Sequence, residues 1–525
     1  MVARAVVERL IIMRRELMVD RLRGGEIFDL LVIGGGATGL GAAVEAASRG
    51  WRVALIERGD FAQGTSSRST KLVHGGVRYL KQGNVSLVRE ALRERGRLLK
   101  NAPHLAHDME FVIPSYSQWN RFFYGTGLKA YDWLAGELSL GASRRVGREE
   151  VLRLLSNVEP RGLVGGVVYH DGQFDDARLA VNLAQTSAEQ GAVVVNYCEC
   201  AGLVKEGGRV AGALVRDKES GAEFVVKAKC VINATGVFVD AVRRLDDAAA
   251  RTMVTVSQGI HVVLPKRFLP GGAALMVPKT ADGRVLFAVP WHDRVIVGTT
   301  DTPVANAGTE PRALAEERAF VLEHARKYLA DDPSEGDVLS VYAGLRPLVK
   351  AGGGGSTASL SRDHTIVVSA AGLVTVTGGK WTTYRKMGED VVDRAEIVAG
   401  WGKRASVTAE LKICGATERE EMALLVRERA ELGERIHPAL DYTRADVVRG
   451  VRQEMARTVE DVLARRTRAL FLDARASIEA APEVARWMAR ELGRDPDWVQ
   501  AQVAAYTELA RGYVFSEPAS TGSDS

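Results

Sequence analysis

The sequence has few cysteines and few aromatic residues. Four cysteines occur among 525 residues, and Phe, Trp and Tyr together make up 6% of the chain. Cys198, Cys200, Cys230 and Cys414 have neither the paired spacing of a zinc site nor the density of a disulfide scaffold. We therefore expect no metal centre and no disulfide framework, and a reducing cytoplasm is the default compartment.

Long apolar runs and a dominant sign of charge are absent as well. No uninterrupted apolar stretch reaches the roughly 18 residues that a membrane-crossing helix needs. With 70 Lys and Arg against 66 Asp and Glu, the net charge of +4 gives no reason to expect nucleic acid as a partner. Residues 1–24 lack the apolar core of a secretory signal and predict an amphipathic lead-in, so any membrane contact is expected to be peripheral.

A strand, a helix and a second strand follow this lead-in. "FDLLVIGG" at 28–35 is the apolar run of a buried parallel strand, and "WRVALIE" at 51–57 supplies the next strand. The small-residue segment between them has helical spacing and stops at Gly50, a residue suited to a helix C-terminus. The order predicts a βαβ unit.

Glycines in the first turn of this unit match a dinucleotide-binding pattern. Gly34, Gly36 and Gly39 occupy the positions of G-x-G-x-x-G, and Glu57 ends the second strand. Gly34 allows a tight turn, Gly36 lets the backbone approach a pyrophosphate, and Gly39 lets helix and strand pack closely. Glu57 can accept a hydrogen bond from a ribose hydroxyl. The unit therefore predicts a dinucleotide site.

Two distant segments favour FAD over an exchanging nicotinamide. Residues 229–240 form an apolar strand that runs into Ala-Thr-Gly at Gly236, and residues 372–395 form a strand that breaks at Gly379 before a helix. A helix N-terminus aimed at a flavin would stabilise the negative charge that reduction leaves there. The alternative is that both are ordinary turns of a doubly wound sheet.

The stretch "GTSSRSTKLVHGGVRYL" at 64–80 gathers positive charge beside the predicted cofactor site. Its cations are Arg68, Lys71, His74 and Arg78. Its first residues offer small hydroxyls and backbone N–H groups suited to phosphate at close range, although such a cluster is also typical of a loop. For Arg68 the alternative is an ion pair with a nearby acid.

Acidic residues gather in "DGQFDDARL" at 171–179. No His or Cys accompanies them, so we interpret the segment as structural or helix-capping and predict no metal site.

These segments together carry a family resemblance. "GTSSRSTKLVHGGVRYL", "DGQFDDARL", "ATG", "GTTDT", "YAGLRPL", "SRDH" and "GGKWTTYR" resemble the FAD-dependent, quinone-linked glycerol-3-phosphate dehydrogenases, in order and nearly collinearly from about residue 13 to residue 475. Residues 458–474 resemble the helical end domain of that family. The resemblance implies oxidation of sn-glycerol 3-phosphate to dihydroxyacetone phosphate, with FAD as cofactor and a membrane quinone as electron acceptor.

The resemblance also implies which residues form the site. Arginine forks suit a phosphate dianion, and three arginines stand in separate motifs. The implied substrate residues are Arg78, Tyr79, Thr299, Arg346, Arg362 and Lys380. The flavin residues are Gly34, Gly36, Gly39, Glu57, Thr65, Ser66, Ser67, Lys71, Leu72, Gly75, Gly236, Gly379, Lys380 and Thr382. Where many relatives have Pro-Trp, this chain has Val237 and Phe238, so local flavin contacts are expected to differ.

The implied chemistry needs a hydride acceptor and a proton acceptor. The hydride passes from C2 of the substrate to flavin N5, and the proton of the C2 hydroxyl goes to a base. His74 and His261 are the candidates for the base, because a neutral imidazole has a suitable proton affinity near pH 7. Lys380 and Arg346 are the candidates for stabilising developing negative charge.

Other functions stay open at this point. A glycerol-3-phosphate oxidase would share the half-reaction and give its electrons to oxygen, and an enzyme of the amino-acid oxidase type would also need arginine for its substrate carboxylate. A non-catalytic flavoprotein is the alternative from a different class.

The architecture expected is α/β, with a Rossmann-like FAD-binding domain interleaved with a β-rich substrate domain and followed by an all-α domain. The boundaries expected are 25–100, 165–245 and 345–400 for the first, 101–164 and 246–344 for the second, and 405–515 for the third, with a polar tail at 516–525 that we expect to be disordered. We expect a cytoplasmic protein held peripherally on the inner face of the cell membrane, with a homodimer left open.

Overall fold

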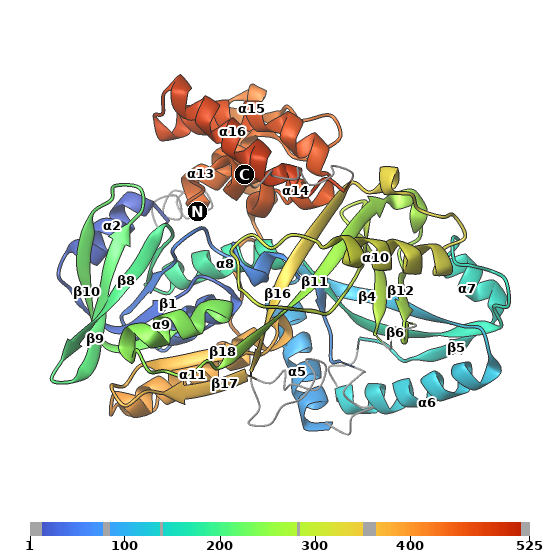
Figure 1. The fold of residues 1–525 in the computed structure, drawn as a ribbon, viewed down its shortest axis with the longest axis horizontal. Helices are drawn as coiled ribbons and strands as arrows, with labels where there is room; N and C mark the ends of the chain where they lie inside the picture. Colours follow the sequence, from blue (N-terminus) through green and yellow to red (C-terminus); the bar gives the residue numbers. More distant parts are fainter. Residues whose placement is uncertain (1–12, 77–84, 137–139, 281–283, 350–363, 516–525) are drawn as a thin grey trace, which may run out of the picture.

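The computed structural model describes residues 13–76, 85–136, 140–280, 284–349 and 364–515. Their strands form an eight-stranded sheet and a ten-stranded sheet, and the C-terminal helices lie above both (Figure 1). The expected α/β fold with an all-helical C-terminal domain is confirmed.

The eight-stranded sheet contains the predicted βαβ unit. β1 pairs in parallel with β10 on one side and with β2 on the other. Its order is β17-β18-β10-β1-β2-β7, with β9 beside β10 and β8 beside β9. The strands are β1 Ile27–Ile33, β2 Val53–Ile56, β7 Val193–Val195, β8 Cys198–Glu206, β9 Arg209–Asp217, β10 Glu223–Asn233, β17 His364–Val368 and β18 Val374–Gly378.

Helices pack on this sheet and bury its central strands. Residues 30–33 of β1 are buried, as the continuous apolar run predicts. The helices of this part are α2 Arg15–Arg23, α3 Ala37–Ser48, α8 Asp176–Glu189, α9 Val239–Asp246 and α11 Tyr384–Val398. α2 buries Met18, Val19 and Leu22 on the sheet, so the described part of the lead-in is a helix packed on the domain.

The strands of the ten-stranded sheet come from two separate parts of the chain, residues 72–174 and residues 254–349. Its order is β15-β11-β14-β13-β12-β4-β6-β3, with β16 beside β11 and β5 beside β6. The strands are β3 Leu72–Val73, β4 Ala106–Ser115, β5 Arg144–Val146, β6 Gly165–Phe174, β11 Val254–Pro265, β12 Ala274–Val277, β13 Leu286–Trp291, β14 Arg294–Gly298, β15 Thr302–Val304 and β16 Ser340–Val349.

Two segments expected in the cofactor domain begin in this second sheet. β6 pairs with β4 over its whole length, from Ala106 opposite Phe174 to Ser115 opposite Gly165. β16 continues through residue 349 along β11. Antiparallel pairing joins residues far apart in sequence, and local patterns do not reveal the partner.

Helices also interrupt the segment 101–164, which was expected to be rich in strands. α6 Gln118–Ala135 begins where Ser117 Oγ accepts from Asn120 N at 3.2 Å, which is a helix N-cap. The helices associated with this sheet are α5 Val85–Asn101, α6, α7 Arg148–Leu154 and α10 Ala315–Tyr328.

The C-terminal part is helical within its described residues. Its helices are α12 Glu418–Glu428, α13 Arg444–Glu454, α14 Ala469–Leu472, α15 Ala474–Leu492 and α16 Pro496–Arg511, with a π-helical turn at Asp461–Arg466. Trp487 and Met488 of α15 lie in its core, which also includes Val263 of β11 and Tyr342 of β16. The helices therefore pack directly on the second sheet. Among the described residues, no helix is both long and apolar enough to cross a membrane.

Candidate cofactor and substrate site

Two glycines, one in the turn between β1 and α3 and one within α3, leave no room for a side chain. Gly34 has φ +115°, and a Cβ there would lie 2.6 Å from the carbonyl oxygen of Ala234. A Cβ on Gly39 would collide with the carbonyl oxygen of Gly34. Both positions require glycine, so β1, β10 and α3 approach one another as a dinucleotide fold demands.

The N-terminus of α3 faces the segment 64–67. Ala37 N donates to Ser66 Oγ at 2.9 Å, and a Cβ on Gly36 would lie 3.1 Å from the same oxygen. Trp381 Nε1 donates to Ser66 O at 2.9 Å. Ser66 is thus fixed against the helix end that carries the positive end of the helix dipole.

Glu57 lies at the end of β2, as predicted. Its carboxylate accepts from Gly35 N at 2.6 Å and from Gly59 N at 2.9 Å. Burial raises the pKa of Glu57 above its ordinary value, although both N–H groups oppose that change. The side chain is therefore held in one orientation at the carboxyl end of β2.

A cleft of about 330 Å³ runs along the ends of these strands. Eight of the predicted residues line it within the described part of the chain. They are Gly34, Gly36, Glu57, Thr65, Ser66, Gly236, Gly379 and Lys380. The segments around residues 34, 65, 236 and 379, which are far apart in sequence, are brought to one cavity.

The residues present fit FAD. The glycine turn leaves a cradle for a pyrophosphate at the start of α3, and Glu57 is positioned for a ribose. Phe238 lines the cleft, and the Arg58 guanidinium lies 4.3 Å from the centre of its ring. Phe238, part of the Val-Phe pair that stands where many relatives have Pro-Trp, therefore forms part of the cleft wall and makes a cation–aromatic contact with Arg58.

Six predicted flavin residues lie outside the cleft lining in the described structure. They are Gly39, Ser67, Lys71, Leu72, Gly75 and Thr382. Gly39 acts through helix packing, and Gly75 N donates to Tyr131 Oη at 2.8 Å. Thr382 Oγ1 accepts from His74 N at 3.2 Å, so these two predicted residues are neighbours.

Lys71 is fully buried and turned into the protein. Its Nζ lies 2.7 and 2.8 Å from the carboxylate oxygens of Asp176 and donates to Ser67 O at 2.7 Å. The rings of Trp291, Tyr342 and Phe471 surround it at 5.1 to 5.4 Å. Lys71 therefore holds the segment 67–71 against Asp176 in the protein interior.

Arg68 has the alternative role that we considered for it. Its Nη2 forms an ion pair with Glu310 at 2.5 Å and donates to Tyr513 Oη at 3.1 Å.

The acidic segment 171–179 has the predicted capping role, because Asp175 Oδ1 accepts from Arg178 N at the start of α8. No cluster of His, Cys, Asp and Glu suited to a metal occurs in the described ranges.

The second sheet brings three predicted substrate-site residues together. Arg346 Nη2 on β16 donates to Thr299 Oγ1 at 3.0 Å, and Arg346 Nη1 lies 3.3 Å from Asp301. A Cβ on Gly259 of β11 would collide with the Arg346 guanidinium, so that group lies over Gly259. His261 is on the same face of β11, two residues away.

His261 is buried within this cluster. Its Nε2 is 2.8 Å from Thr70 Oγ1, its ring stacks on Tyr342 with centroids 4.8 Å apart, and its Nδ1 has no hydrogen-bond partner among the described residues. Burial lowers the pKa of His261 well below its ordinary value, and the charges of Arg346 and Lys71 act in the same direction. The imidazole is therefore neutral at pH 7.

Residues 65–69, beside the cofactor cleft, contact β16, the strand that carries Arg346. Tyr342 Oη donates to Ser69 O at 2.9 Å, and Thr65 Oγ1 donates to Leu345 O at 2.6 Å. Pro347, next to Arg346 on β16, lines the cofactor cleft. The strand that carries the arginine thus also forms a wall of the cleft.

Three predicted residues, Arg78, Tyr79 and Arg362, lie outside the described residues. Thr70, Asp301 and Tyr342 contact His261 and Arg346 but were not predicted as site residues from the sequence. All three stand in motifs that carry the resemblance, "RSTKL", "GTTDT" and "YAGLRPL", so their motif context was the available signal.

The glycine turn, the fixed Glu57 and the cleft define a dinucleotide-binding protein, and comparison with protein families identifies it as an oxidoreductase. The family model described as FAD dependent oxidoreductase matches residues 29–385, and that of the C-terminal domain of alpha-glycerophosphate oxidase matches residues 396–499. The glycerol-3-phosphate dehydrogenases, mitochondrial, of Mesocricetus auratus and Homo sapiens are each 39% identical to this chain, over 96% of it and 75% of their own length.

A solved structure is similar over nearly the whole molecule. The glycerol-3-phosphate dehydrogenase from Bacillus halodurans complexed with FAD is 27% identical, with a TM-score of 0.77, over 96% of this chain and 98% of its own. The chain belongs to the FAD-dependent glycerol-3-phosphate dehydrogenase family.

Proposed function

We propose that this protein oxidises sn-glycerol 3-phosphate to dihydroxyacetone phosphate. The observation that carries the proposal is the continuity of β16, which places Pro347 in the cofactor cleft and Arg346 in a cluster with Thr299 and His261. A substrate held by Arg346 through its phosphate or its C2 oxygen would therefore lie beside the cofactor. The relatives named for this activity support the same substrate.

His261 is the proton acceptor that the geometry favours over His74. It is neutral, it lies beside Arg346, and its Nδ1 is buried without a hydrogen-bond partner among the described residues, so we propose this nitrogen as the one that takes the proton. His74 instead lies beside Thr382, next to the Lys380 turn. Bound FAD would accept the hydride from C2, and Arg346 and Lys380 would stabilise the negative charge that develops on the C2 oxygen.

Anaerobic reduction tests the substrate. Mixing the holoenzyme with sn-glycerol 3-phosphate should bleach the absorbance of the oxidised flavin, whereas glycerol, which lacks the phosphate, should bleach it only at far higher concentration. Bleaching by glycine with none by sn-glycerol 3-phosphate would indicate an enzyme of the amino-acid oxidase type and reject the proposal.

We propose a membrane quinone as the electron acceptor. The alternative acceptor is oxygen, since residues 396–499 match the family model of the C-terminal domain of alpha-glycerophosphate oxidase. The reduced enzyme should reoxidise faster with a soluble quinone analogue than with air, without stoichiometric peroxide. Rapid reoxidation by oxygen with peroxide release would identify an oxidase.

Exposed aromatic side chains on α6 support peripheral contact with a membrane. Trp119 and Trp133 are 71% and 76% exposed, and Phe122 and Phe123 are also exposed, while Leu128 of the same helix is buried. Large aromatics beside basic residues suit the interface of a bilayer. We propose that this helix contacts the inner face of the cell membrane, as expected for a cytoplasmic enzyme that reduces quinone.

Vesicle flotation tests this contact. Changing Trp119 and Trp133 to Ser should lower the fraction of protein bound to anionic vesicles severalfold without changing flavin content. Equal flotation of both proteins would remove α6 from the contact. A homodimer stays a prediction, and light scattering of the purified protein would decide it.

A further inference from the structure

The segment between β2 and residue 65 forms one wall of the cofactor cleft without being a helix or a strand. Its residues at the wall are Glu57, Arg58, Ala62, Gln63 and Gly64. On its inner side, Ala62 N donates to Gly35 O at 2.9 Å, and Gly59 N donates to Glu57. The position of this segment therefore sets the shape of the cleft at its glycine turn.

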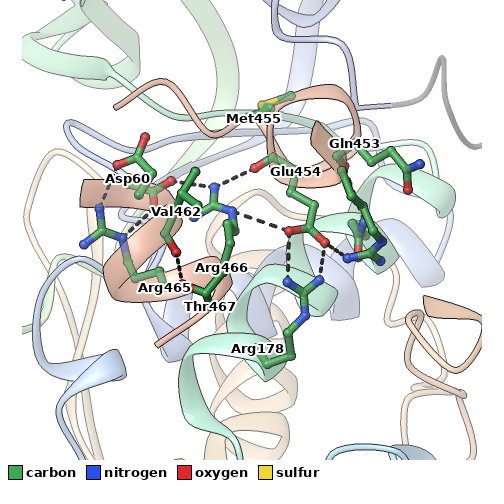
Figure 2. A network of polar contacts seen from close by, with 12 residues as sticks. Asp60, Arg178, Gln453, Glu454, Met455, Val462, Arg465, Arg466 and Thr467 are labelled. Carbon is green, nitrogen blue, oxygen red and sulfur yellow. Dashed lines mark hydrogen bonds and ion pairs between the residues drawn. The ribbon is translucent and has the colours of Figure 1, made fainter. Parts of the chain in front are cut away.

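The outer side of the segment is held by the C-terminal domain. Asp60 receives Arg466 Nη1 at 2.5 Å and Nη2 at 2.9 Å on its two carboxylate oxygens, and Arg465 Nε at 2.5 Å. Both arginines belong to the π-helical turn Asp461–Arg466. Figure 2 shows the two guanidinium groups pointing at Asp60 from this turn. Residues about 400 positions apart thus form one charge cluster.

The cluster is closed to solvent. Asp60 is 0% exposed and Arg465 is 1% exposed. Although burial opposes ionisation, Arg466 and Arg465 hold the pKa of Asp60 at about 2. Removing one member would leave a buried charge without its partner, which is costly, whereas an intact buried pair adds little net stability. The cluster therefore fixes the position of Asp60 and its segment more than it adds to the net stability of the fold.

A second contact joins the same two parts nearer the cleft. Gln63 Nε2 donates to Glu460 Oε1 at 3.3 Å, and Arg465 Nη1 donates to the same oxygen at 2.7 Å. Gln63 itself lines the cleft, and its carbonyl oxygen accepts from Arg68 Nη1 at 2.8 Å. The turn at 461–466 therefore holds the wall at Asp60, and Glu460, the residue before the turn, holds it at Gln63.

The cluster extends to a third element. Arg466 Nη2 donates to Glu454 O at 2.6 Å, and the Glu454 carboxylate accepts from Arg178 of α8 (Figure 2). Asn196 Nδ2 donates both to Asp60 at 3.1 Å and to Met455 O at 2.8 Å. The turn is thus anchored on the cofactor sheet and its helix, and it cannot shift without moving Asp60.

We propose that the C-terminal helical domain is part of the cofactor site: its turn Asp461–Arg466 positions the cleft wall 57–64 through Asp60, so FAD retention depends on residues outside the cleft lining. Asp60, Arg465 and Arg466 are positioning residues. The proposal concerns cofactor retention and holds whichever substrate the enzyme oxidises.

Release of FAD from the holoenzyme tests the proposal. Asp60→Asn keeps the shape of the side chain and removes its charge, and the rate at which FAD leaves after dilution should rise about tenfold, followed as flavin fluorescence. Glu483→Gln is the control, because Glu483 of α15 pairs with Arg444 of α13 at 2.7 Å inside the same domain, and neither residue belongs to the Asp60 cluster. Equal release rates in the two variants would overturn the proposal.

A milder variant covers the case in which Asp60→Asn does not fold. Glu460→Ala removes the contact with Gln63 and one acidic partner of Arg465, while Asp60 keeps its ion pairs with both arginines. It should accelerate FAD release severalfold while the thermal unfolding temperature of the holoenzyme changes little. A release rate equal to that of the unchanged protein would contradict the proposal.

Hydrogen exchange gives a readout that a role in stability alone would not move. Coupling between two sites is reciprocal, so FAD should protect the turn if the turn holds FAD. Backbone amides of residues 460–467 should exchange more slowly in the FAD-loaded protein than in protein stripped of FAD, relative to those of α15. Equal exchange in both forms would show that the turn and the cofactor site are independent.

Discussion

The cofactor end and the substrate end of the site are built in different ways. The cofactor end uses backbone: glycines at 34 and 39 allow the chain to approach itself, and Glu57 is fixed by the backbone N–H groups of Gly35 and Gly59. The substrate end uses side chains from strands far apart in sequence, with His261, Thr299 and Arg346 as its centre. The cofactor end should tolerate no added carbon at Gly34 or Gly39, and the substrate end should tolerate no loss of a polar group at its centre.

The largest effect is expected from Gly34→Ala. The added methyl would meet the Ala234 carbonyl oxygen in a backbone conformation that disfavours side chains, at a cost of about 3 kcal/mol. FAD affinity should fall more than about a hundredfold, measured as flavin bound per chain. Gly64→Ala, where a Cβ meets nothing within 4 Å at the same cleft, should retain its flavin.

His261→Gln should have the next largest effect, now on the chemical step. Losing the proton acceptor should lower kcat by about 10²- to 10⁴-fold with FAD still bound. Steady-state kinetics beside the flavin spectrum would separate the two. A kcat within a factor of two of the unchanged enzyme would return the role of base to His74.

Arg346→Ala should separate binding from cofactor retention. Removal of a guanidinium that binds the substrate should cost about 2–4 kcal/mol in kcat/KM, roughly 30- to 1000-fold, and leave flavin content unchanged. Arg267→Ala is the control, because Arg267 is exposed on the same part of the chain and pairs with Asp337. Loss of flavin in Arg346→Ala would show that the two ends are not separable.

Stability against pH should show opposite contributions from two histidines. The folded-state pKa of His261 is lowered by burial, so the unfolded chain binds its proton more readily, and this residue should destabilise the protein as pH falls below about 6.5. The pKa of His170 is raised by its hydrogen bond to Asp108, so its contribution is present below about pH 6.5 and is lost as pH rises through the folded value. Denaturant unfolding of His261→Gln and His170→Gln across pH 5 to about 8 should show slopes that change in opposite directions.

The smallest effect is expected where the two ends touch. Thr65→Val removes the hydrogen bond to Leu345 O, worth about 1 kcal/mol, and should change both FAD release and KM by no more than about fivefold. Rapid dilution and initial rates measure the two quantities. A change confined to FAD release would place Thr65 at the cofactor end alone.

The cofactor end could be predicted from sequence because its parts are local. The strand, turn, helix and acid of 28–57 lie in one continuous stretch, and each residue has the place in the structure that the pattern predicts. The sheet partners could not be predicted in the same way. β6 joins the second sheet because of its pairing with β4, and no local property of residues 165–174 distinguishes that sheet from the first.

At the substrate end the sequence predicted residues but not their contacts. Arg346 and Thr299 were expected in the site from their motifs, whereas the register of β11 against β16, which brings His261 beside them, depends on pairing at long range. Lys71 shows the limit most clearly. Its motif suggests a flavin contact, and its side chain is buried on Asp176 because a polar partner from α8 lies beneath it. The Asp60 cluster likewise joins residues about 400 positions apart.

The central claim is that this chain transfers the electrons of sn-glycerol 3-phosphate to its own FAD. The most direct test is an anaerobic titration of the FAD-loaded protein with sn-glycerol 3-phosphate, following flavin absorbance and assaying dihydroxyacetone phosphate in the same sample. The account predicts progressive bleaching with dihydroxyacetone phosphate equal to the flavin reduced. A flavin that stays oxidised at saturating sn-glycerol 3-phosphate, while chemical reductant bleaches it, would contradict the account.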